Sequence, residues 1–449
     1  MTLNNLSKSF IFVCIRKKAM KYDNIPSKLF IDNRKRLAKE LKKGGLAILN
    51  SNDIMPTNAD GHMSLKQNTD LFHLSGVDQE ESILVVFPDS FNKKHREILF
   101  LKETSDLIAV WEGAKLNKEQ ATEVSGVETI YWLNQFESVI RGLIIESKHV
   151  YLNTNEHLRA HVEVETRDTR FIKKIQSDFP LHSYKRLAPI MHELRSIKHP
   201  IELDIMQKAC NITEKGFRRI LEFVKPGVSE HEIEAEYAHE FLWNRSRGFA
   251  YGPIVASGGS ACVLHYIEND KPCNDGDVIL MDVGAEYGNY ASDMTRCIPV
   301  NGKFTPRQKD VYNAVLRVMK AATKLLVPGT YLTDYHVAVG HLMEKELIGL
   351  GLITQEDIDN ENPDWPAYKK YFMHGTSHYI GLDVHDVGSW AKPIKPNMVF
   401  TVEPGIYIPE ENLGIRLEND VVVQEKGEPF DLMRNIPLEA DEIEALMAK

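Results

Sequence analysis

The amino-acid sequence predicts two domains, an α/β domain followed by a second domain of long helices and hydrophobic strands. The chain has 449 residues, too many for one ordinary core, and 43% of them are apolar, which is normal for a globular protein. From residue 31 to about 185, helical stretches alternate with short β-rich runs. Residues 191–245 then have helical periodicity for most of their length, with a break at a Lys-Pro-Gly sequence.

Individual segments of the first domain support the α/β prediction. DNRKRLAKELKKGG (residues 32–45) has the spacing of an amphipathic helix. The runs LAIL (46–49), ESILVVF (81–87) and HVYL (149–152) have the composition of buried strands. Alternation of such helices and strands is typical of a layered α/β domain.

The second domain is predicted to contain strands separated by Gly, Pro and Asn turns, with helices at about 305–326 and 334–350. The acidic segment ITQEDIDNENPDWP (353–366) is interpreted as a solvated loop. The predicted organisation has three parts: an N-terminal extension of residues 1–24, a first domain of residues 25–190 and a second domain of residues 191–449. Met20 opens a more ordinary amphipathic start, so residues 1–19 are interpreted as an upstream extension or a disordered tail.

Composition excludes several classes of function. The net charge is −10 and the basic residues are scattered, so the sequence has no footprint for nucleic acid or an anionic membrane. The apolar run at residues 10–15 is far shorter than the roughly 20 residues of a membrane span, and the basic cluster at 16–18 follows it. The five cysteines form no CxxC pair, which indicates neither a disulfide framework nor a thiolate zinc site. We therefore expect a cytoplasmic protein that acts on a small or neutral partner.

Two aspartates, Asp282 and Asp293, lie in LMDVGAEYGNYASDMTR (280–296), a segment that otherwise has the pattern of two apolar strands and a tight turn. A turn at residues 287–288 pairs the aspartates directly, whereas a turn at 288–289 makes them diagonal neighbours. Both registers keep the carboxylates on one face, about 5 to 8 Å apart at the side-chain base. Because an unpaired buried carboxylate is costly, the pair predicts a positive partner.

Further unusual residues follow downstream. Glu403 lies in the middle of the apolar strand MVFTVEPGIYI, and Glu418 begins another strand in GIRLENDVVV. His374, His378 and His385 lie among glycines in FMHGTSHYIGLDVHDVG. Each residue alone is typical of a half-exposed strand acid or a packed histidine, but together with the two aspartates they predict a metal site.

The number of carboxylates predicts two ions. Four carboxylates and an imidazole exceed the needs of one ion, whereas two divalent cations about 3.5 to 4 Å apart would neutralise them. Ligation mostly by oxygen suits Mn²⁺, our first choice, and also Co²⁺ or Fe²⁺, with Zn²⁺ possible.

These residues resemble a known family, the dinuclear pita-bread metallopeptidases, and within it aminopeptidase P (Xaa-Pro aminopeptidase). The similarity extends from about residue 25 to 440 and includes the entry segment HELRSIKHPIELDIMQKA. The family's metal-ligand set is matched in order by Asp282, Asp293, His378, Glu403 and Glu418. The resemblance implies a creatinase/prolidase-like α/β N-terminal domain and an α+β pita-bread catalytic domain with a curved antiparallel sheet.

The resemblance also implies how the ligands are shared. Asp282 would chelate one metal and His378 the other, while Asp293, Glu403 and Glu418 would contribute to the shared shell. A metal-bridged hydroxide would then attack the peptide bond, so no protein nucleophile is needed.

Other positions match the family's substrate-side residues. His265 and His385 match histidines expected to stabilise the oxyanion or to move protons, and Arg416 matches a buried arginine beside the site that serves substrate binding and catalysis. His374 matches a position near the proline pocket, although a packing role is an equal alternative. Glu403 is expected to take a proton from the water and pass it to the leaving nitrogen.

The resemblance implies a substrate peptide with proline in second position and a homodimer or higher homo-oligomer, while the charge pattern predicts no nucleic-acid or membrane partner. Candidate walls of a proline pocket are Tyr251, Tyr379 and Tyr407, each of which is equally a candidate core residue. Ser257 and Ser260 in ASGGS lack the nucleophile-elbow pattern and are assigned to a turn.

Four alternatives to the aminopeptidase prediction differ in what they require. Prolidase, the nearest, shares the ligand set but acts only on Xaa-Pro dipeptides. Methionine aminopeptidases usually lack so large a first domain. A creatinase-like amidinohydrolase or a non-enzymatic pita-bread binding protein is expected to lack ligands that this sequence retains.

Overall fold

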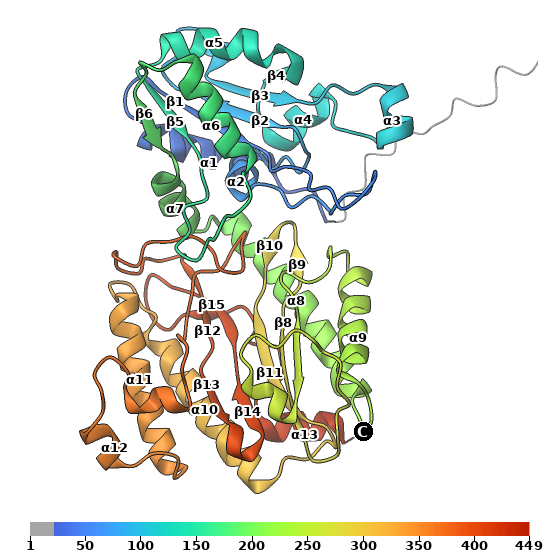
Figure 1. Cartoon of the computed structure of the whole chain (residues 1–449), viewed down its shortest axis with the longest axis vertical. Helices are drawn as coiled ribbons and strands as arrows, with labels where there is room; N and C mark the ends of the chain where they lie inside the picture. The colour runs from blue at the N-terminus through green and yellow to red at the C-terminus, as the bar shows by residue number, and fades with distance from the viewer. Residues whose placement is uncertain (1–21, 449) are drawn as a thin grey trace, which may run out of the picture.

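The structure is a computed structural model that describes residues 22–448. Figure 1 shows an upper unit built on one sheet and a lower unit in which helices surround several strands. The predicted extension of residues 1–24 lies outside the described residues except for 22–24. Within the described part of the chain, no helix has the length and apolar character needed to cross a membrane.

The upper unit contains a six-stranded mixed sheet with the strand order β4-β3-β2-β1-β5-β6. β1 pairs antiparallel with β2 and parallel with β5, so the sheet combines both kinds of ladder. The strands are β1 (Gly45–Asn50), β2 (Ile83–Val86), β3 (Glu97–Leu101), β4 (Thr129–Trp132), β5 (His149–Leu152) and β6 (Tyr184–Arg186). The strand segments predicted at 46–49, 81–87 and 149–152 are confirmed.

Helices cover both faces of this sheet and bury its apolar side chains in two clusters. One face is covered by α1 (Ser27–Glu40), α2 (Thr69–Ser75), α4 (Lys118–Ser125) and α7 (Ala188–Ser196). The other is covered by α5 (Phe136–Glu146) and α6 (Arg167–Asp178), while α3 (Asp106–Glu112) has no buried residue. Met191 and Leu194 pack in the first cluster, so side chains beyond the division predicted at 190/191 belong to this core. That division stays a prediction.

The lower unit has one large hydrophobic core between its helices and its antiparallel ladders. Its helices are α8 (Pro200–Phe223), α9 (Glu230–Trp243), α10 (Pro306–Leu325), α11 (Leu332–Gly349), α12 (Gln355–Asp359) and α13 (Ala440–Met447). Its strands are β7 (Ile254–Ser257), β8 (Val278–Val283), β9 (Glu286–Tyr287), β10 (Tyr290–Ala291), β11 (Met294–Pro299), β12 (Val399–Val402), β13 (Gly405–Ile408), β14 (Leu413–Arg416), β15 (Asn419–Val422) and β16 (Phe430–Asp431). Short 3₁₀ helices occupy Lys93–His95, Leu133–Gln135, Gly258–Cys262, Ala367–Lys370 and Pro409–Glu411.

Helix boundaries differ from the prediction in two places. The helical segment at 191–245 is interrupted before Pro200 as well as at Lys-Pro-Gly, because proline disfavours a helical residue before it and is suited to a first helical position. The prediction of a loop at 353–366 is wrong over α12, where Thr354 and Asp357 form a capping box that stabilises a short helix.

The hairpin that carries the two aspartates uses the second of the two predicted registers. Its turn is Gly288-Asn289, and both residues have positive φ, as a type I′ turn requires. Asp282 therefore lies opposite Thr295, and Asp293 is its diagonal neighbour. This register places both carboxylates on one face of the hairpin.

Candidate active site

A cavity of about 320 Å³ in the lower unit is lined by every residue that the sequence predicted as a metal ligand or as a catalytic or substrate-binding residue. The predicted metal ligands there are Asp282, Asp293, His378, Glu403 and Glu418. The predicted substrate-side residues there are His265, His374, His385 and Arg416. Residues far apart in the sequence thus meet at one place.

Strands and the breaks between them hold the carboxylates. Asp282 lies in β8 and Asp293 immediately before β11. Glu403 lies in the break between β12 and β13 rather than in the middle of a strand, because Pro404 has no N–H to continue the ladder. Glu418 lies in the break between β14 and β15, where its N–H donates to the carbonyl of Thr295 at 3.1 Å.

Burial and mutual repulsion act on these carboxylates. Burial, followed by the charge of Asp282, raises the pKa of Asp293 well above its usual range. Burial, followed by the charges of Asp293 and Glu403, raises the pKa of Glu418 well above its usual range. Like charges gathered at a buried site are stable when a cation neutralises them.

The donor set fits a metal ion. Asp293, His378 and Glu418 are buried, and each offers one ligand atom within 4.8 Å of the others. Nδ1 of His378 donates to the carbonyl of Tyr379 at 3.0 Å, so Nε2 is the unprotonated nitrogen of a neutral ring. That Nε2 lies 3.5 Å from Asp293 Oδ2 and 3.7 Å from Glu403 Oε1, so its lone pair lies close to oxygens of two carboxylates. Oxygen ligands with one imidazole nitrogen suit divalent metals.

Tyr251 and Arg416 orient the two aspartates. The Tyr251 hydroxyl lies 2.7 Å from Asp282 Oδ1 and 2.5 Å from Asp293 Oδ1. Nη2 of Arg416 donates to Asp282 Oδ2 at 2.6 Å. Tyr251 lines the cavity, and its hydroxyl contacts these two carboxylates there.

A second chain of hydrogen bonds connects Arg416 to His374. Nη1 of Arg416 donates to the Tyr407 hydroxyl at 2.9 Å, and that hydroxyl donates to Nε2 of His374 at 2.7 Å. The direction follows because Nδ1 of His374 donates to the carbonyl of Gly375 at 2.8 Å. Tyr407 therefore connects Arg416 to His374 without lining the cavity. Tyr379 does not line the cavity either.

The remaining histidines lie at the substrate side. The His385 ring packs edge-on against His378, with ring centroids 4.5 Å apart at an angle of 87°. Burial, followed by the charge of His378, lowers the pKa of His385 to about 3, so its ring is neutral at physiological pH. His265 is exposed where it lines the cavity.

Arg159 is a cavity residue that the sequence analysis missed. It lies in the connection between β5 and α6 of the upper unit, yet it lines the cavity of the lower unit. No local motif marks this arginine, because only the packing of the two units brings its segment to the site. The sequence analysis also missed the apolar walls Ile254, Leu264 and Ile267, which belong to the lower unit itself.

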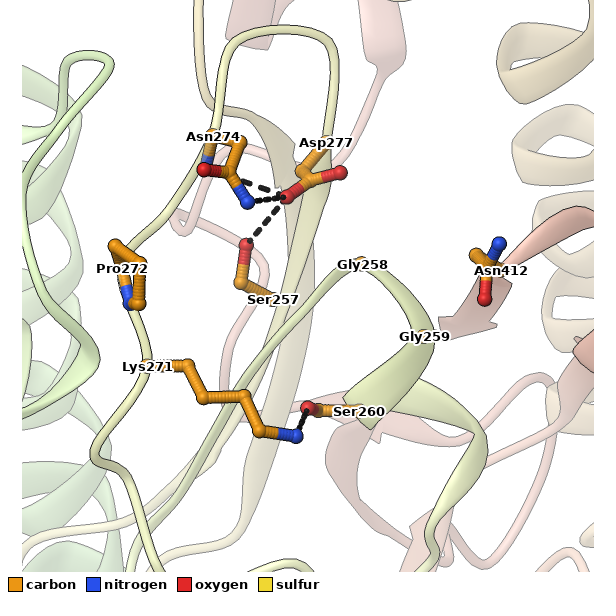
Figure 2. Close-up of a pocket in the computed structure, with 9 residues that line it drawn as sticks. All are labelled: Ser257, Gly258, Gly259, Ser260, Lys271, Pro272, Asn274, Asp277 and Asn412. Atoms are coloured by element: carbon orange, nitrogen blue, oxygen red, sulfur yellow. Dashed lines mark hydrogen bonds between the residues drawn. The ribbon is translucent and has the colours of Figure 1, made fainter.

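A second cavity, of about 380 Å³, lies away from these residues and contains the two serines of ASGGS (Figure 2). Ser257 ends β7 and donates to Asp277 Oδ2 at 3.4 Å, while Ser260 lies in a 3₁₀ helix and accepts from Lys271 Nζ at 2.8 Å. No histidine is among the described residues that line this cavity. The prediction that both serines lie in a turn is wrong, since Ser257 belongs to a strand and Ser260 to a 3₁₀ helix.

Two family models match the chain. Metallopeptidase family M24 matches residues 204–425, and the aminopeptidase P N-terminal domain matches residues 30–151. Xaa-Pro aminopeptidase of Escherichia coli (strain K12) is 33% identical over 93% of this chain and 97% of its own length. Xaa-Pro aminopeptidase 3 of Homo sapiens is 32% identical over 85% of this chain and 77% of its own length.

Solved structures agree with this assignment. Aminopeptidase PepP of Pseudomonas aeruginosa is similar with a TM-score of 0.86 and 31% identity, over 95% of this chain and 98% of that one. A zinc-substituted E. coli aminopeptidase P in complex with product is similar with a TM-score of 0.83 and 31% identity, over 95% and 99% of the two chains. The chain therefore belongs to metallopeptidase family M24, with an aminopeptidase P N-terminal domain and a pita-bread catalytic domain, and it is a metal-dependent aminopeptidase.

Proposed function

We propose that this aminopeptidase releases the first residue of peptides that carry proline in second position. The observation that carries the proposal is the cavity in which four carboxylates, held in strands or in the breaks between them, meet the unprotonated Nε2 of His378. Relatives named Xaa-Pro aminopeptidase support the proline specificity. A structure similar to this one is E. coli aminopeptidase P with the inhibitor Pro-Leu.

The proposed ligands are Asp282, Asp293, His378, Glu403 and Glu418, holding two divalent ions. When bound, the two ions supply Lewis acidity that activates water and polarises the scissile carbonyl. Mn²⁺ is the proposed metal, because the donors are mainly carboxylate oxygens. Chelation followed by separate reconstitution with Mn²⁺, Co²⁺, Fe²⁺ and Zn²⁺ tests this choice, and higher activity with another ion at equal occupancy would replace it.

The residues around the ligands have proposed roles in proton transfer and substrate binding. Glu403 accepts a proton from the attacking water and delivers it to the leaving nitrogen. His265 and His385 donate to the oxyanion or move protons on the substrate side. Arg416 holds Asp282 directly and holds His374 through Tyr407, which keeps both oriented toward the substrate.

Peptide length separates this function from prolidase. A prolidase needs the free carboxylate of proline, so a longer peptide leaves a recognition group unpaired, which discriminates strongly. We expect cleavage of Ala-Pro-Ala after the first residue, and resistance of acetyl-Ala-Pro-Ala and Ala-Ala-Ala. Hydrolysis of Ala-Pro alone would identify a prolidase, and efficient hydrolysis of Ala-Ala-Ala would remove the proline specificity.

We also propose a homodimer or higher homo-oligomer. Three apolar residues of α3, Leu107, Val110 and Trp111, are 73%, 77% and 84% exposed, which supports contact with a second copy. Light scattering that shows only a 51.2 kDa species at micromolar concentration would contradict it. A cytoplasmic location is proposed from the cysteines, of which Cys210, Cys273 and Cys297 are buried unpaired thiols.

A further inference from the structure

Arg195 lies at the end of α7, where the two units meet (Figure 1). On the upper side, its Nη1 donates to Thr69 Oγ1 at 2.7 Å and to Asp70 Oδ1 at 2.9 Å, both in α2. On the lower side, its Nη2 donates to Asp383 Oδ2 at 2.8 Å and to Asp386 Oδ1 at 2.5 Å. One guanidinium, only 3% exposed, thus joins the first unit to the loop of the active site.

Asp386 is held on its other oxygen as well. Nζ of Lys198 donates to Asp386 Oδ2 at 2.9 Å and to the carbonyl of Arg195 at 2.7 Å. A Cβ at Gly381 would lie 2.3 Å from that same oxygen, so the carboxylate fills the space available to it. Both oxygens of Asp386 are therefore fixed by buried cations.

The position of Asp386 is transmitted to the cavity through its neighbours. Asp386 directly follows His385, the histidine packed on the ring of His378. The Asp386 N–H donates to the carbonyl of Tyr379 at 2.8 Å, and the same carbonyl accepts the His378 Nδ1 proton. A shift of Asp386 would therefore reach His385, the residue before it in the chain, and the carbonyl of Tyr379.

Asp70, the partner of Arg195 in the upper unit, is also held on both oxygens. Asp70 Oδ2 accepts a hydrogen bond from Asn153 Nδ2 at 2.8 Å, so Asp70 has partners on both oxygens. Burial opposes ionisation of Asp386, but the charges of Arg195 and Lys198 outweigh it and lower its pKa to about 2. Without Arg195, the carboxylates of Asp70 and Asp386 would be buried with too little positive charge, and the loop would be expected to rearrange.

We propose that Arg195 is a positioning residue, which acts through Asp386 to hold His385 against the substrate by anchoring its loop to the first unit. The proposal rests on the proposed catalytic role of His385. It assigns no contact between Arg195 and substrate. Since a misplacement of about 1 Å in a catalytic group costs on the order of a hundredfold in rate, such an anchor has a measurable effect.

The test compares Arg195→Met and Arg195→Lys with the wild type, loaded with Mn²⁺, on Ala-Pro-Ala. We expect Arg195→Met to lower kcat at least about tenfold while metal content stays at the wild-type level and KM changes less. Arg195→Lys keeps the positive charge but does not bridge Asp70 and Asp386 as the guanidinium does. Its kcat should therefore lie between those of Arg195→Met and the wild type. The matched control is Arg34→Met, which removes another buried arginine of the first unit whose partners are Glu97, Leu74 and Ser125. Arg34→Met should lower the melting temperature without changing kcat.

A double-mutant cycle with His385→Ala separates positioning from a general structural effect. If Arg195 acts through His385, Arg195→Met should lower kcat less than about twofold in the His385→Ala background. Should Arg195→Met fail to fold, Asp70→Asn enters the same cycle, with an expected loss of about threefold that disappears in the His385→Ala background.

Three outcomes would overturn the proposal: equal factors in both backgrounds, loss of metal in proportion to kcat, or an unchanged kcat in Arg195→Met. A wild-type protein that leaves Ala-Pro-Ala intact would instead refute the proposed function, so the two failures are distinguishable.

Discussion

The two sides of the cavity are built differently. The carboxylate side rests on antiparallel ladders, in which Asp282 lies opposite Thr295 and the N–H of Glu418 donates to the Thr295 carbonyl. The histidine side belongs to residues 371–398, which form neither helix nor strand apart from an isolated bridge at Tyr379. Ladders hold their side chains by local pairing, whereas this loop depends on buried charges that reach the other unit. The positions of the carboxylate ligands should therefore tolerate distant changes better than the positions of the loop histidines do.

The largest expected effect comes from removing a carboxylate of the ladder. Asp293→Ala should abolish turnover and reduce bound metal while the fold persists, because the hairpin is held by its backbone pairing. Activity on Ala-Pro-Ala and metal per chain are the measurements. Asp277→Ala, which removes a carboxylate at the second cavity, is the control and should keep both. Full activity of Asp293→Ala would break the dinuclear assignment.

His385→Ala tests the loop side of the comparison. We expect kcat to fall on the order of a hundredfold, with metal content near the wild-type level, because the ring acts on the substrate rather than as a ligand. Kinetics on Ala-Pro-Ala and metal analysis of the same sample give both quantities. Metal loss equal to the activity loss would make His385 a ligand and remove the distinction between the two sides.

The buried ion pairs of Asp386 with Arg195 and Lys198 predict that the folded protein loses stability in acid. The pKa of Asp386 is lowered from 3.8 to about 2 in the folded state, so its contribution to stability is full above pH 3.8 and is lost as pH falls toward 2. That shift corresponds to roughly 2 kcal/mol. Asp386→Asn should therefore be less stable than the wild type at neutral pH, and the difference should shrink between pH 4 and pH 2. Denaturant melts at these pH values measure it, and a constant difference would exclude Asp386 as the titrating group.

The smallest effect is expected at the second cavity. Ser260→Ala removes the acceptor for Lys271 Nζ but no group of the active site, so kcat and KM should stay within about twofold of the wild type. A large loss of kcat at unchanged metal content would give this serine a catalytic role, and the assignment of one active site would then fail.

Much of the carboxylate side was predictable from the sequence because its signals are local. Alternating apolar residues around Asp282 and Asp293 predict a hairpin, and a hairpin confines both carboxylates to one face in either register. The choice of register needed the structure, since Tyr-Gly and Gly-Asn turns are both reasonable. Thr354 and Asp357 also carried a local capping signal, which the prediction of an acidic loop overlooked.

The sequence by itself predicted the residues that we propose to bind metal and substrate, because strand periodicity and the ordered acid and histidine motifs are local patterns along the chain, and the structure gathers these residues in one cavity. Only the tertiary structure decided that Arg159 reaches the cavity from the first unit and that Arg195 joins Asp70 to Asp386. The physical reason is distance along the chain. Arg195 and Asp386 are brought together by the packing of whole units, and no spacing or periodicity around either residue specifies its partner.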